Sequence, residues 1–181
     1  DVRILDIGAG GGDLCRSLAG RLRGDGLQAR ITALDPDERA MHWARANDGG
    51  AGIEYRCATS TELAAAGERF DVIVSNHLLH HLSAHERAAV LDDSERLVAP
   101  EGVVAHHDIA RGRLAYALYA IGTAAFARTL LADSFIRIDG LLSIRRSYTD
   151  RELRDVAPAG WTVRSALPAR LELRFDAPAG R

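Results

Sequence analysis

The sequence predicts an α/β domain with a doubly wound, mostly parallel sheet, and three apolar runs carry this prediction. The first run, at 2–7, contains the acid Asp6 near its end and leads into a glycine-rich turn. The second run, at 31–35, is short and closes on Asp35. The third run, at 70–75, is nearly continuous, which is typical of a central strand buried on both faces.

The turn after the first run has glycine at alternate positions, Gly8, Gly10 and Gly12, and a helical pattern follows it. Glycine allows a sharp turn at positive φ and leaves no Cβ in the way of a ligand that approaches the backbone. A strand that leads through such a turn into a helix N-terminus is a general way for α/β folds to hold nucleotide-like ligands. The turn therefore predicts a nucleoside-containing cofactor.

The glycine spacing indicates which kind of cofactor this is. Dinucleotide-binding turns have the pattern G-x-G-x-x-G, whereas this turn reads G-x-G-x-G and has Asp13 at the third dinucleotide position. An acid there suits the start of a helix but would repel a pyrophosphate. The spacing favours a cofactor without phosphates.

Asp35 is the second candidate for cofactor binding. An acid at the end of the second strand of a doubly wound sheet can accept hydrogen bonds from both ribose hydroxyls. The alternative is an ordinary loop acid that caps the helix after Pro36. The glycine turn upstream favours the ribose contact.

Other patterns complete the predicted order of elements. Leu14, Leu18 and Leu22 recur at i, i+4 and i+8 and predict a helix after the glycine turn. Capping boxes that begin at Ser83 and Thr149 predict the starts of two later helices. The remaining predicted elements are helices at 37–46, 83–97 and 149–157, strands at 53–57, 103–108, 161–166 and 170–175, and a turn at 100–102.

Length and composition indicate one ordinary globular domain, 1–181, with a core large enough to fold alone. The net charge of −2 and the lack of an aromatic-studded basic stripe argue against a nucleic-acid partner. The spacing of Cys15 and Cys57 suggests neither a metal site nor a disulfide, so a reducing cytoplasm is the expected compartment.

The segment 114–132 is unusually apolar and has no charged residue before Arg128. A membrane span needs about 20 apolar residues, and Arg128 and Asp133 interrupt this segment too early. Two interpretations stay open: a core helix buried all round, or a lid or oligomer surface, for example of a homodimer, that covers an apolar substrate. We expect the region 111–148 to be an insertion that covers the substrate.

The motifs Asp6-x-Gly8-x-Gly10-x-Gly12, Asp35-Pro36 and Phe70-Asp-Val-Ile-Val-Ser-Asn76 together resemble the class I S-adenosylmethionine-dependent methyltransferases. The resemblance covers residues 1–108. It implies a Rossmann-like three-layer sandwich whose seven-stranded sheet has one antiparallel strand near the C-terminus. It also implies one or two helices before Asp1 that help to close the cofactor site.

The resemblance also implies which residues hold S-adenosyl-L-methionine and its product S-adenosyl-L-homocysteine. The glycine turn would pass under the methionine part, Asp35 would hold the ribose, and Asp6 and Asn76 would lie near the amino-acid end. Many relatives have Asp-Ala after the third strand, where this chain has Ala58 and Thr59 after a cysteine, so a backbone or Thr59 contact is expected to replace the adenine-binding carboxylate. The expected cofactor residues are Asp6, Gly8, Ala9, Gly10, Gly12, Asp35, Pro36, Ala58, Thr59 and Asn76.

Five of the seven histidines form two clusters, one at 77–81 and the other at 106–107. Parallel strands end at the same edge of a sheet, so both clusters are expected near the cofactor. No cysteine or paired acid completes a metal-ligand set, so no metal is expected. An imidazole suits removal of a phenol's proton at neutral pH, and the candidates for this base are His77 and His107.

The secondary roles of these histidines stay open. Asp108 could orient His107, although neighbours in an extended strand point to opposite faces. His80 and His81 are expected to pack beneath the site. The alternative for all of them is that they only line the pocket or cap helices.

A second, less specific resemblance covers about 105–150 and is to bacterial methyltransferases that act on quinone precursors or polyketide-derived phenols. The predicted function is methyl transfer to a small apolar acceptor, at the hydroxyl oxygen of a phenolic or polyketide-derived compound of secondary metabolism. The alternatives are C-methylation of a quinone precursor, a nicotinamide-dependent oxidoreductase, and a protein that binds the cofactor without catalysis.

Overall fold

The apolar runs form one mixed sheet in the computed structural model of the chain, which describes residues 1–124, 136–166 and 169–180. The strands are β1 (Val2–Ile7), β2 (Ala29–Asp35), β3 (Glu54–Cys57), β4 (Phe70–Asn76), β5 (Val98–Ile109), β6 (Thr162–Ala166) and β7 (Arg170–Asp176). Their order is β3-β2-β1-β4-β5-β7-β6, and among these described strands β7 alone runs in the direction opposite to the others. The predicted Rossmann-like sheet is confirmed.

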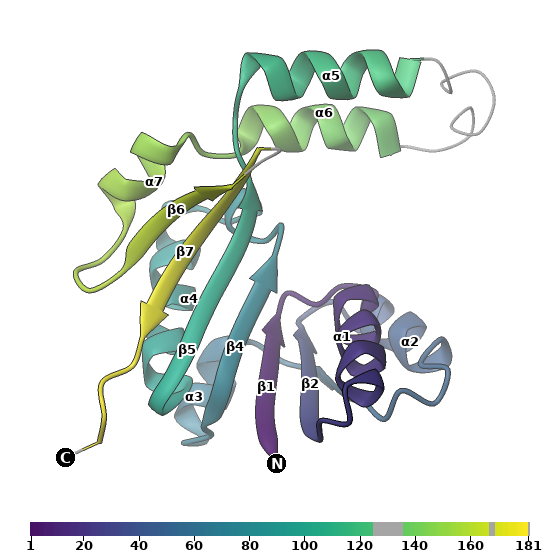
Figure 1. Cartoon of the computed structure of the whole chain (residues 1–181), viewed down its shortest axis with the longest axis vertical. Coiled ribbons are helices and arrows are strands. Elements are labelled where there is room, and N and C mark those ends of the chain that lie inside the picture. The colour runs from purple at the N-terminus through teal and green to yellow at the C-terminus, as the bar shows by residue number, and fades with distance from the viewer. Residues whose placement is uncertain (125–135, 167–168, 181) are drawn as a thin grey trace.

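Helices cover both faces of this sheet and make three layers (Figure 1). They are α1 (Asp13–Gly24), α2 (Glu38–Ala46), α3 (Ser60–Ala65), α4 (Ala84–Leu97), α5 (Arg113–Ala124), α6 (Ile136–Arg146) and α7 (Asp150–Val156), with a 3₁₀ helix η1 (Leu79–His81). In Figure 1, α1 lies in front of the sheet, and α3 and α4 lie behind it. The pair α5 and α6 lies beyond the carboxyl ends of β4 and β5.

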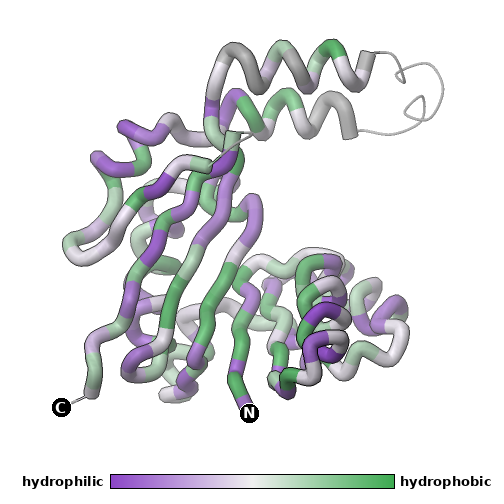
Figure 2. Tube along the Cα trace, viewed as in Figure 1, coloured by the Kyte–Doolittle hydropathy of each residue, from purple (hydrophilic) through white to green (hydrophobic). Residues whose placement is uncertain are grey.

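Two apolar clusters join the layers, and hydrophobic residues recur along the middle strands in Figure 2. The larger cluster packs the sheet against α3, α4 and α7 and includes Leu5 and Leu91. The smaller cluster packs β1 and β2 against α1 and includes Ile4 and Cys15. Ile4 and Leu5 belong to different clusters because neighbouring strand residues point to opposite faces.

The buried stripe of α1 differs from the predicted row of leucines. Leu14 is 36% exposed, whereas Cys15 and Ala19 are buried and Leu18 and Leu22 pack against the smaller cluster. Positions 15, 18, 19 and 22 follow the i, i+3, i+4, i+7 spacing of a helix face that is turned to a core. The predicted helix is confirmed, and its buried stripe includes Leu18 and Leu22 but not Leu14.

Two boundaries also differ from expectation. The predicted turn at 100–102 is part of β5, which begins at Val98 and has a register shift against β4. Glu101 has φ 62°, and a Cβ on Gly102 would lie 2.8 Å from the carbonyl oxygen of Asp71, so the chain bends here within the strand. The short helix α3 was not predicted, although Thr59 and Glu62 form a capping box of the kind used for later helices.

The apolar segment 114–132 is described only as far as residue 124, within α5, and 125–132 lies outside the described residues. Ile121 is 71% exposed, so α5 is not a helix buried all round. Within the described ranges, no helix has the length and apolar character needed to cross a membrane. The exposure favours the interpretation as a lid or a surface for association.

Candidate active site

The glycine turn is fixed to the end of β2 by backbone N–H groups. Those of Gly8 and Ala9 donate to one β2 carbonyl oxygen at 2.8 and 3.0 Å, and that of Gly10 donates to Asp35 Oδ2 at 2.9 Å. Asp35 Oδ1 accepts from the N–H of Asp37 at 2.8 Å. Each carboxylate oxygen has a second lone pair, so Asp35 can still accept a hydrogen bond from a ligand hydroxyl.

The alternate glycines are required by backbone conformation and by space. Gly8, Gly10 and Gly12 have φ values of 72°, 51° and 75°. A Cβ on Gly8 would lie 2.7 Å from the side chain of Leu78, and one on Gly12 would lie 2.9 Å from that of Tyr55. The turn therefore needs glycine at these positions, and only a Cβ on Gly10 would meet nothing within 4 Å, so the backbone there is open to a cofactor that lies against the turn.

A cavity of about 200 Å³, here called the first cavity, opens beside this turn. The predicted cofactor residues that line it are Gly8, Pro36, Ala58 and Thr59. Leu34, Leu78 and Leu82 make much of its wall apolar. Such a cavity suits a flat, weakly polar group such as a nucleobase.

The remaining predicted cofactor residues lie outside the first cavity, along the turn and the strand ends: Asp6, Ala9, Gly10, Gly12, Asp35 and Asn76. The hydroxyl of Thr59 is already engaged in capping α3. It donates to the Glu62 carboxylate at 2.9 Å and accepts from the Glu62 N–H at 3.3 Å. Of the two contacts expected to replace the missing carboxylate, the geometry favours the backbone near Ala58.

Asp6 is a buried carboxyl group behind the glycine turn, with 2% of its surface exposed. Burial raises the pKa of Asp6 to about 7, and the charge of Asp35 adds to this, whereas a hydrogen bond from the Cys15 thiol at 3.2 Å opposes it. Burial also raises the pKa of the Cys15 thiol, so this group stays protonated and donates. A cationic ligand group close to Asp6 would favour its ionised form.

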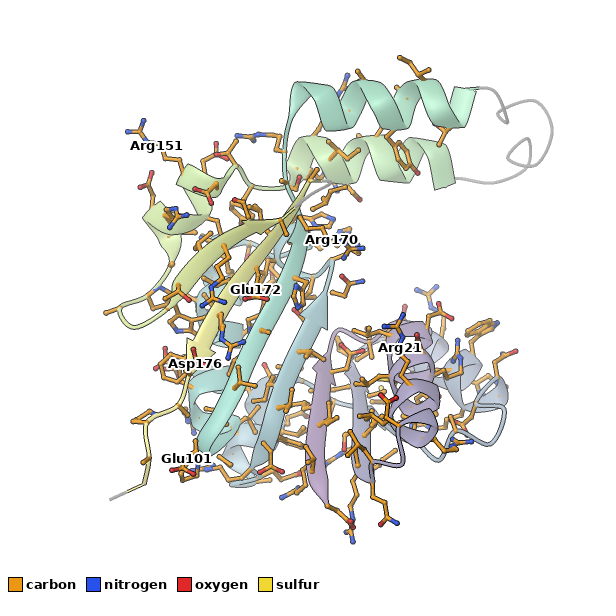
Figure 3. The ribbon with its side chains drawn as sticks, viewed as in Figure 1. Arg21, Glu101, Arg151, Arg170, Glu172 and Asp176 are labelled. Atoms are coloured by element: carbon orange, nitrogen blue, oxygen red, sulfur yellow. The ribbon has the colours of Figure 1, made fainter. Side chains whose placement is uncertain are left out.

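Asp108, near the end of β5, binds His80 and not His107. Its Oδ1 lies 2.6 Å from His80 Nδ1, and its Oδ2 accepts from the His80 N–H at 3.0 Å. The expected orientation of His107 by Asp108 is wrong, because adjacent strand residues point to opposite faces. His107 Nε2 instead lies 3.9 Å from the carboxylate of Glu172, which is labelled on β7 in Figure 3.

His77 follows the end of β4 in a left-handed conformation, with φ 60°. This conformation costs a non-glycine residue about 1–2 kcal/mol, so the surrounding structure must hold it. The His77 N–H donates to the His107 carbonyl oxygen at 2.9 Å, and the side chain is 42% exposed. Burial lowers the pKa of His77, and the charge of Asp108 partly offsets this, so the imidazole is neutral at pH 7.

His106 does not join the other histidines, contrary to the expected convergence. It is fully buried on the α4 side of the sheet, where its ring nitrogens lie 2.8 Å from Ser75 Oγ and 3.2 Å from Ser94 Oγ. Its ring stacks on the ring of Trp161, with the two ring centroids 5.6 Å apart. Burial lowers the pKa of His106 to about 3, so this side chain is a neutral part of the core.

The burial of His106 predicts a pH-dependent stability. The unfolded chain binds a proton here below about pH 6.5 and the folded chain does not, so the free energy of unfolding falls as the pH drops from there towards 3. This one group contributes a slope of at most about 1.4 kcal/mol per pH unit. Urea unfolding of the wild type and of His106→Gln at pH 7, 6 and 5 should give a flatter profile for the variant. Parallel profiles would contradict this role of His106.

A second cavity, of about 290 Å³, lies between η1 and the α5–α6 pair. Histidines from the β4 end and η1 line one side, and residues of the helix pair line the other: His77, His80, His81, Tyr119, Ser143 and Ile144. Burial lowers the pKa of His81 as it does that of His77. The part of the chain that the structure describes has no group of three or more His, Cys, Asp or Glu residues that could hold a metal ion.

The segment 77–82 separates the two cavities. Two of its three leucines, Leu78 and Leu82, line the first cavity, whereas its three histidines line the second. The sequence analysis missed Leu78 and Leu82 as site residues, as well as the pairing of His80 with Asp108. The mixture of histidines and leucines over 77–82, His-Leu-Leu-His-His-Leu, was the available signal for a two-sided segment.

A Rossmann-like sheet with a glycine cradle at one strand end and an acid at the next defines a nucleoside-cofactor-binding α/β domain. The family model described as "Methyltransferase domain" matches residues 4–102, more than half of the chain. The chain belongs to the class I S-adenosylmethionine-dependent methyltransferases, and S-adenosylmethionine is its cofactor. The alternative prediction, a nicotinamide-dependent oxidoreductase, does not agree with membership of this family.

Relatives among known proteins agree with this assignment. The chain is 36% identical over 124 residues to the ubiquinone biosynthesis O-methyltransferase of Parvibaculum lavamentivorans, covering 67% of this chain and 46% of the relative. It is 33% identical over 172 residues to the protein of the same name from Cereibacter sphaeroides, covering 89% and 66%. The chain thus spans about half to two thirds of these relatives' lengths.

Solved structures show the same fold at low sequence identity. The plantazolicin methyltransferase BamL, in complex with a triazolic desmethylPZN analog and SAH, has a TM-score of 0.72 at 15% identity, covering 97% of this chain and 77% of that one. The structure described as "Conversion of a Disulfide Bond into a Thioacetal Group during Echinomycin Biosynthesis" has a TM-score of 0.66 at 22% identity, covering 100% and 77%.

Proposed function

We propose that the chain transfers a methyl group from S-adenosylmethionine to the hydroxyl oxygen of a small, mostly apolar phenolic or polyketide-type acceptor. The observation that carries this proposal is the second cavity, which is lined by His77, His81 and residues of the α5–α6 pair, and where burial lowers the pKa of both histidines. An apolar ring would pack against the helix pair, and its hydroxyl would face the imidazoles. The names of the two relatives, which are O-methyltransferases, support methylation on oxygen.

For the cofactor we propose the arrangement expected from the motifs. The adenine would occupy the first cavity, the ribose hydroxyls would bind Asp35, and the amino-acid end would lie near Asp6 and Asn76. The bound cofactor supplies an electrophilic methyl group, so the main task of the protein is to align the acceptor oxygen with it. Asp35, the glycine turn and the α5–α6 pair would perform the binding and exclude water. As the compartment we propose the cytoplasm, supported by the free thiols of Cys15 and Cys57.

The proposal is tested by incubating the chain with S-adenosylmethionine that carries a ¹³C-labelled methyl group and a panel of phenols. The panel combines simple phenols, phenols with apolar side chains and hydroxylated quinone precursors. Nuclear magnetic resonance distinguishes a methoxy carbon from a ring methyl carbon. Methoxy products on the apolar phenols support the proposal. Ring methylation would favour the C-methylation alternative, and cofactor binding without any transfer would favour a non-catalytic protein.

The two histidines proposed to act on the acceptor should differ in effect. His77 lines the second cavity, whereas the side chain of His107 faces β7. We expect His77→Ala to lower kcat by about tenfold or more through misalignment of the acceptor, with little change in cofactor Kd. His107→Ala should lower kcat less. Turnover of the preferred phenol and calorimetry of the cofactor check both effects, and unchanged turnover in both variants would remove these residues from catalysis.

A further inference from the structure

His80 is a buried imidazole with only half of its hydrogen bonding satisfied. Its side chain is 1% exposed, and its Nδ1 lies 2.6 Å from Asp108 Oδ1. Its Nε2 is buried and has no hydrogen-bond partner within the described ranges. A carboxylate only accepts hydrogen bonds, so in the neutral imidazole Nδ1 carries the hydrogen and Nε2 presents a lone pair.

Asp108 is held in place for this contact. It is 1% exposed and accepts from three donors: His80 Nδ1, the His80 N–H and the Ile109 N–H, the last at 2.7 Å. A buried carboxylate is costly unless it is paired and hydrogen-bonded, and these contacts supply that environment. A positive charge formed on the His80 ring would complete the pair.

His80 is one of the residues that line the second cavity, and the His81 ring packs against the His80 ring at a centroid distance of 4.0 Å. Ile144 and Tyr119 also line this cavity. A planar apolar molecule that fills this space and displaces the His81 ring would bring a hydroxyl to Nε2. The unsatisfied nitrogen would then gain the donor that it lacks.

We propose that His80 is the general base of the methyl transfer and that Asp108 is the residue that positions it; this inference rests on the proposed function. The acceptor O–H bond breaks, its proton goes to His80 Nε2 and its electron pair stays on the oxygen. The oxygen forms a bond to the methyl carbon as the methyl–sulfur bond breaks and leaves its pair on sulfur. Asp108 stabilises the imidazolium, which later loses its proton to water.

His77 has a different role in this scheme. Its Nδ1 lies 3.9 Å from Asp108 Oδ1, which is beyond hydrogen-bonding distance, and its side chain is 42% exposed. It lacks the buried, fixed carboxylate contact of His80. His77 therefore positions the acceptor, and its substitution should not depend on how acidic the acceptor is.

The test compares two phenols on His80→Gln, on His77→Gln as the matched control, and on the wild type. One phenol has a pKa of ~10, and the other is a nitro-substituted phenol that is already ionised at the assay pH. His80→Gln should lose about 10²–10⁴-fold in kcat on the first phenol and far less on the second, which needs no base. His77→Gln should lose a similar factor on both.

If His80→Gln lowers kcat equally on the two phenols, the inference is overturned. It is also overturned if the loss of kcat depends on the phenol in His77→Gln and not in His80→Gln. A wild-type chain that methylates neither phenol overturns the proposed function itself, and the inference with it. The wild-type reaction therefore distinguishes the two failures.

A second measurement uses the wild-type chain alone, without the cofactor and without any substitution. Nitrogen-15 chemical shifts of histidine in the wild-type chain report which ring nitrogen carries the hydrogen. The inference expects a protonated Nδ1 and an unprotonated Nε2 at His80 at neutral pH. A hydrogen on Nε2, with or without one on Nδ1, would overturn it, because that nitrogen could then not accept the acceptor's proton.

Discussion

Asp35→Ala is expected to weaken the binding of S-adenosylmethionine by about 1–3 kcal/mol, roughly 5- to 150-fold in Kd. The variant removes the proposed acceptor of the ribose hydrogen bonds. It also removes the carboxylate that accepts from the N–H groups of Gly10 and Asp37, so the glycine turn loses its tie to the start of α2. Isothermal titration calorimetry with the cofactor measures the effect.

Asp37→Asn is the matched control for this variant. Asp37 is the N-cap of α2 and accepts from the Arg39 N–H at 2.9 Å, a contact that asparagine also makes. The control removes one negative charge two positions away and keeps the local fold. We expect its Kd to stay close to that of the wild type. If both variants lose cofactor affinity equally, the loss comes from the removal of a nearby negative charge, and Asp35 has no specific role in binding the ribose.

Gly8→Ala is expected to weaken cofactor binding by at least about tenfold and to destabilise the fold. An alanine at φ 72° costs about 1–2 kcal/mol, and its Cβ would lie 2.7 Å from Leu78 in the wall of the first cavity. Either Leu78 moves into the cavity or the turn moves away from β2. Calorimetry measures the loss of affinity, and urea unfolding measures the loss of stability.

Two controls separate the causes in this case. Gly20→Ala lies within α1, where a Cβ would meet nothing within 4 Å, and it should raise stability by about 0.5–1 kcal/mol. Gly8→Ala combined with Leu78→Ala restores the space and keeps only the strain of positive φ, so part of the affinity should return. Wild-type affinity in Gly8→Ala would show that the turn does not approach the cofactor.

The positions of the strands along the chain followed from the sequence because the apolar runs and turns carry local signals, and a resemblance supplied the seven-stranded sheet with its antiparallel strand. The N-terminus of α3 carries the same kind of local signal, because Thr59 and Glu62 form a capping box, so this helix was also predictable from the sequence. The turn at 100–102 was predicted, but its place within β5 was not predictable, because the strand begins before the turn by pairing with β4. That pairing is a tertiary contact.

The positions of the glycine turn and Asp35 at the strand ends were predictable for the same local reason. The positions of the histidine side chains relative to the site were not. Which of His106, His107 and Asp108 faces the site depends on which face of β5 is covered by α4, and spacing alone does not say this. The pairing of His80 with Asp108 joins residues 28 positions apart through a single turn of 3₁₀ helix. Only the folded chain brings these two residues together.

The central claim is that one edge of the sheet holds cofactor and acceptor in two neighbouring cavities divided by the segment 77–82. A crystal structure of the chain with S-adenosylhomocysteine and a methylated phenol from the panel tests it most directly. The account predicts adenine beside Ala58 and Leu78, ribose on Asp35, and the phenol between His80 and Ile144 on the other side of the segment. A phenol bound on the Leu78 side, or a ribose away from Asp35, would contradict it.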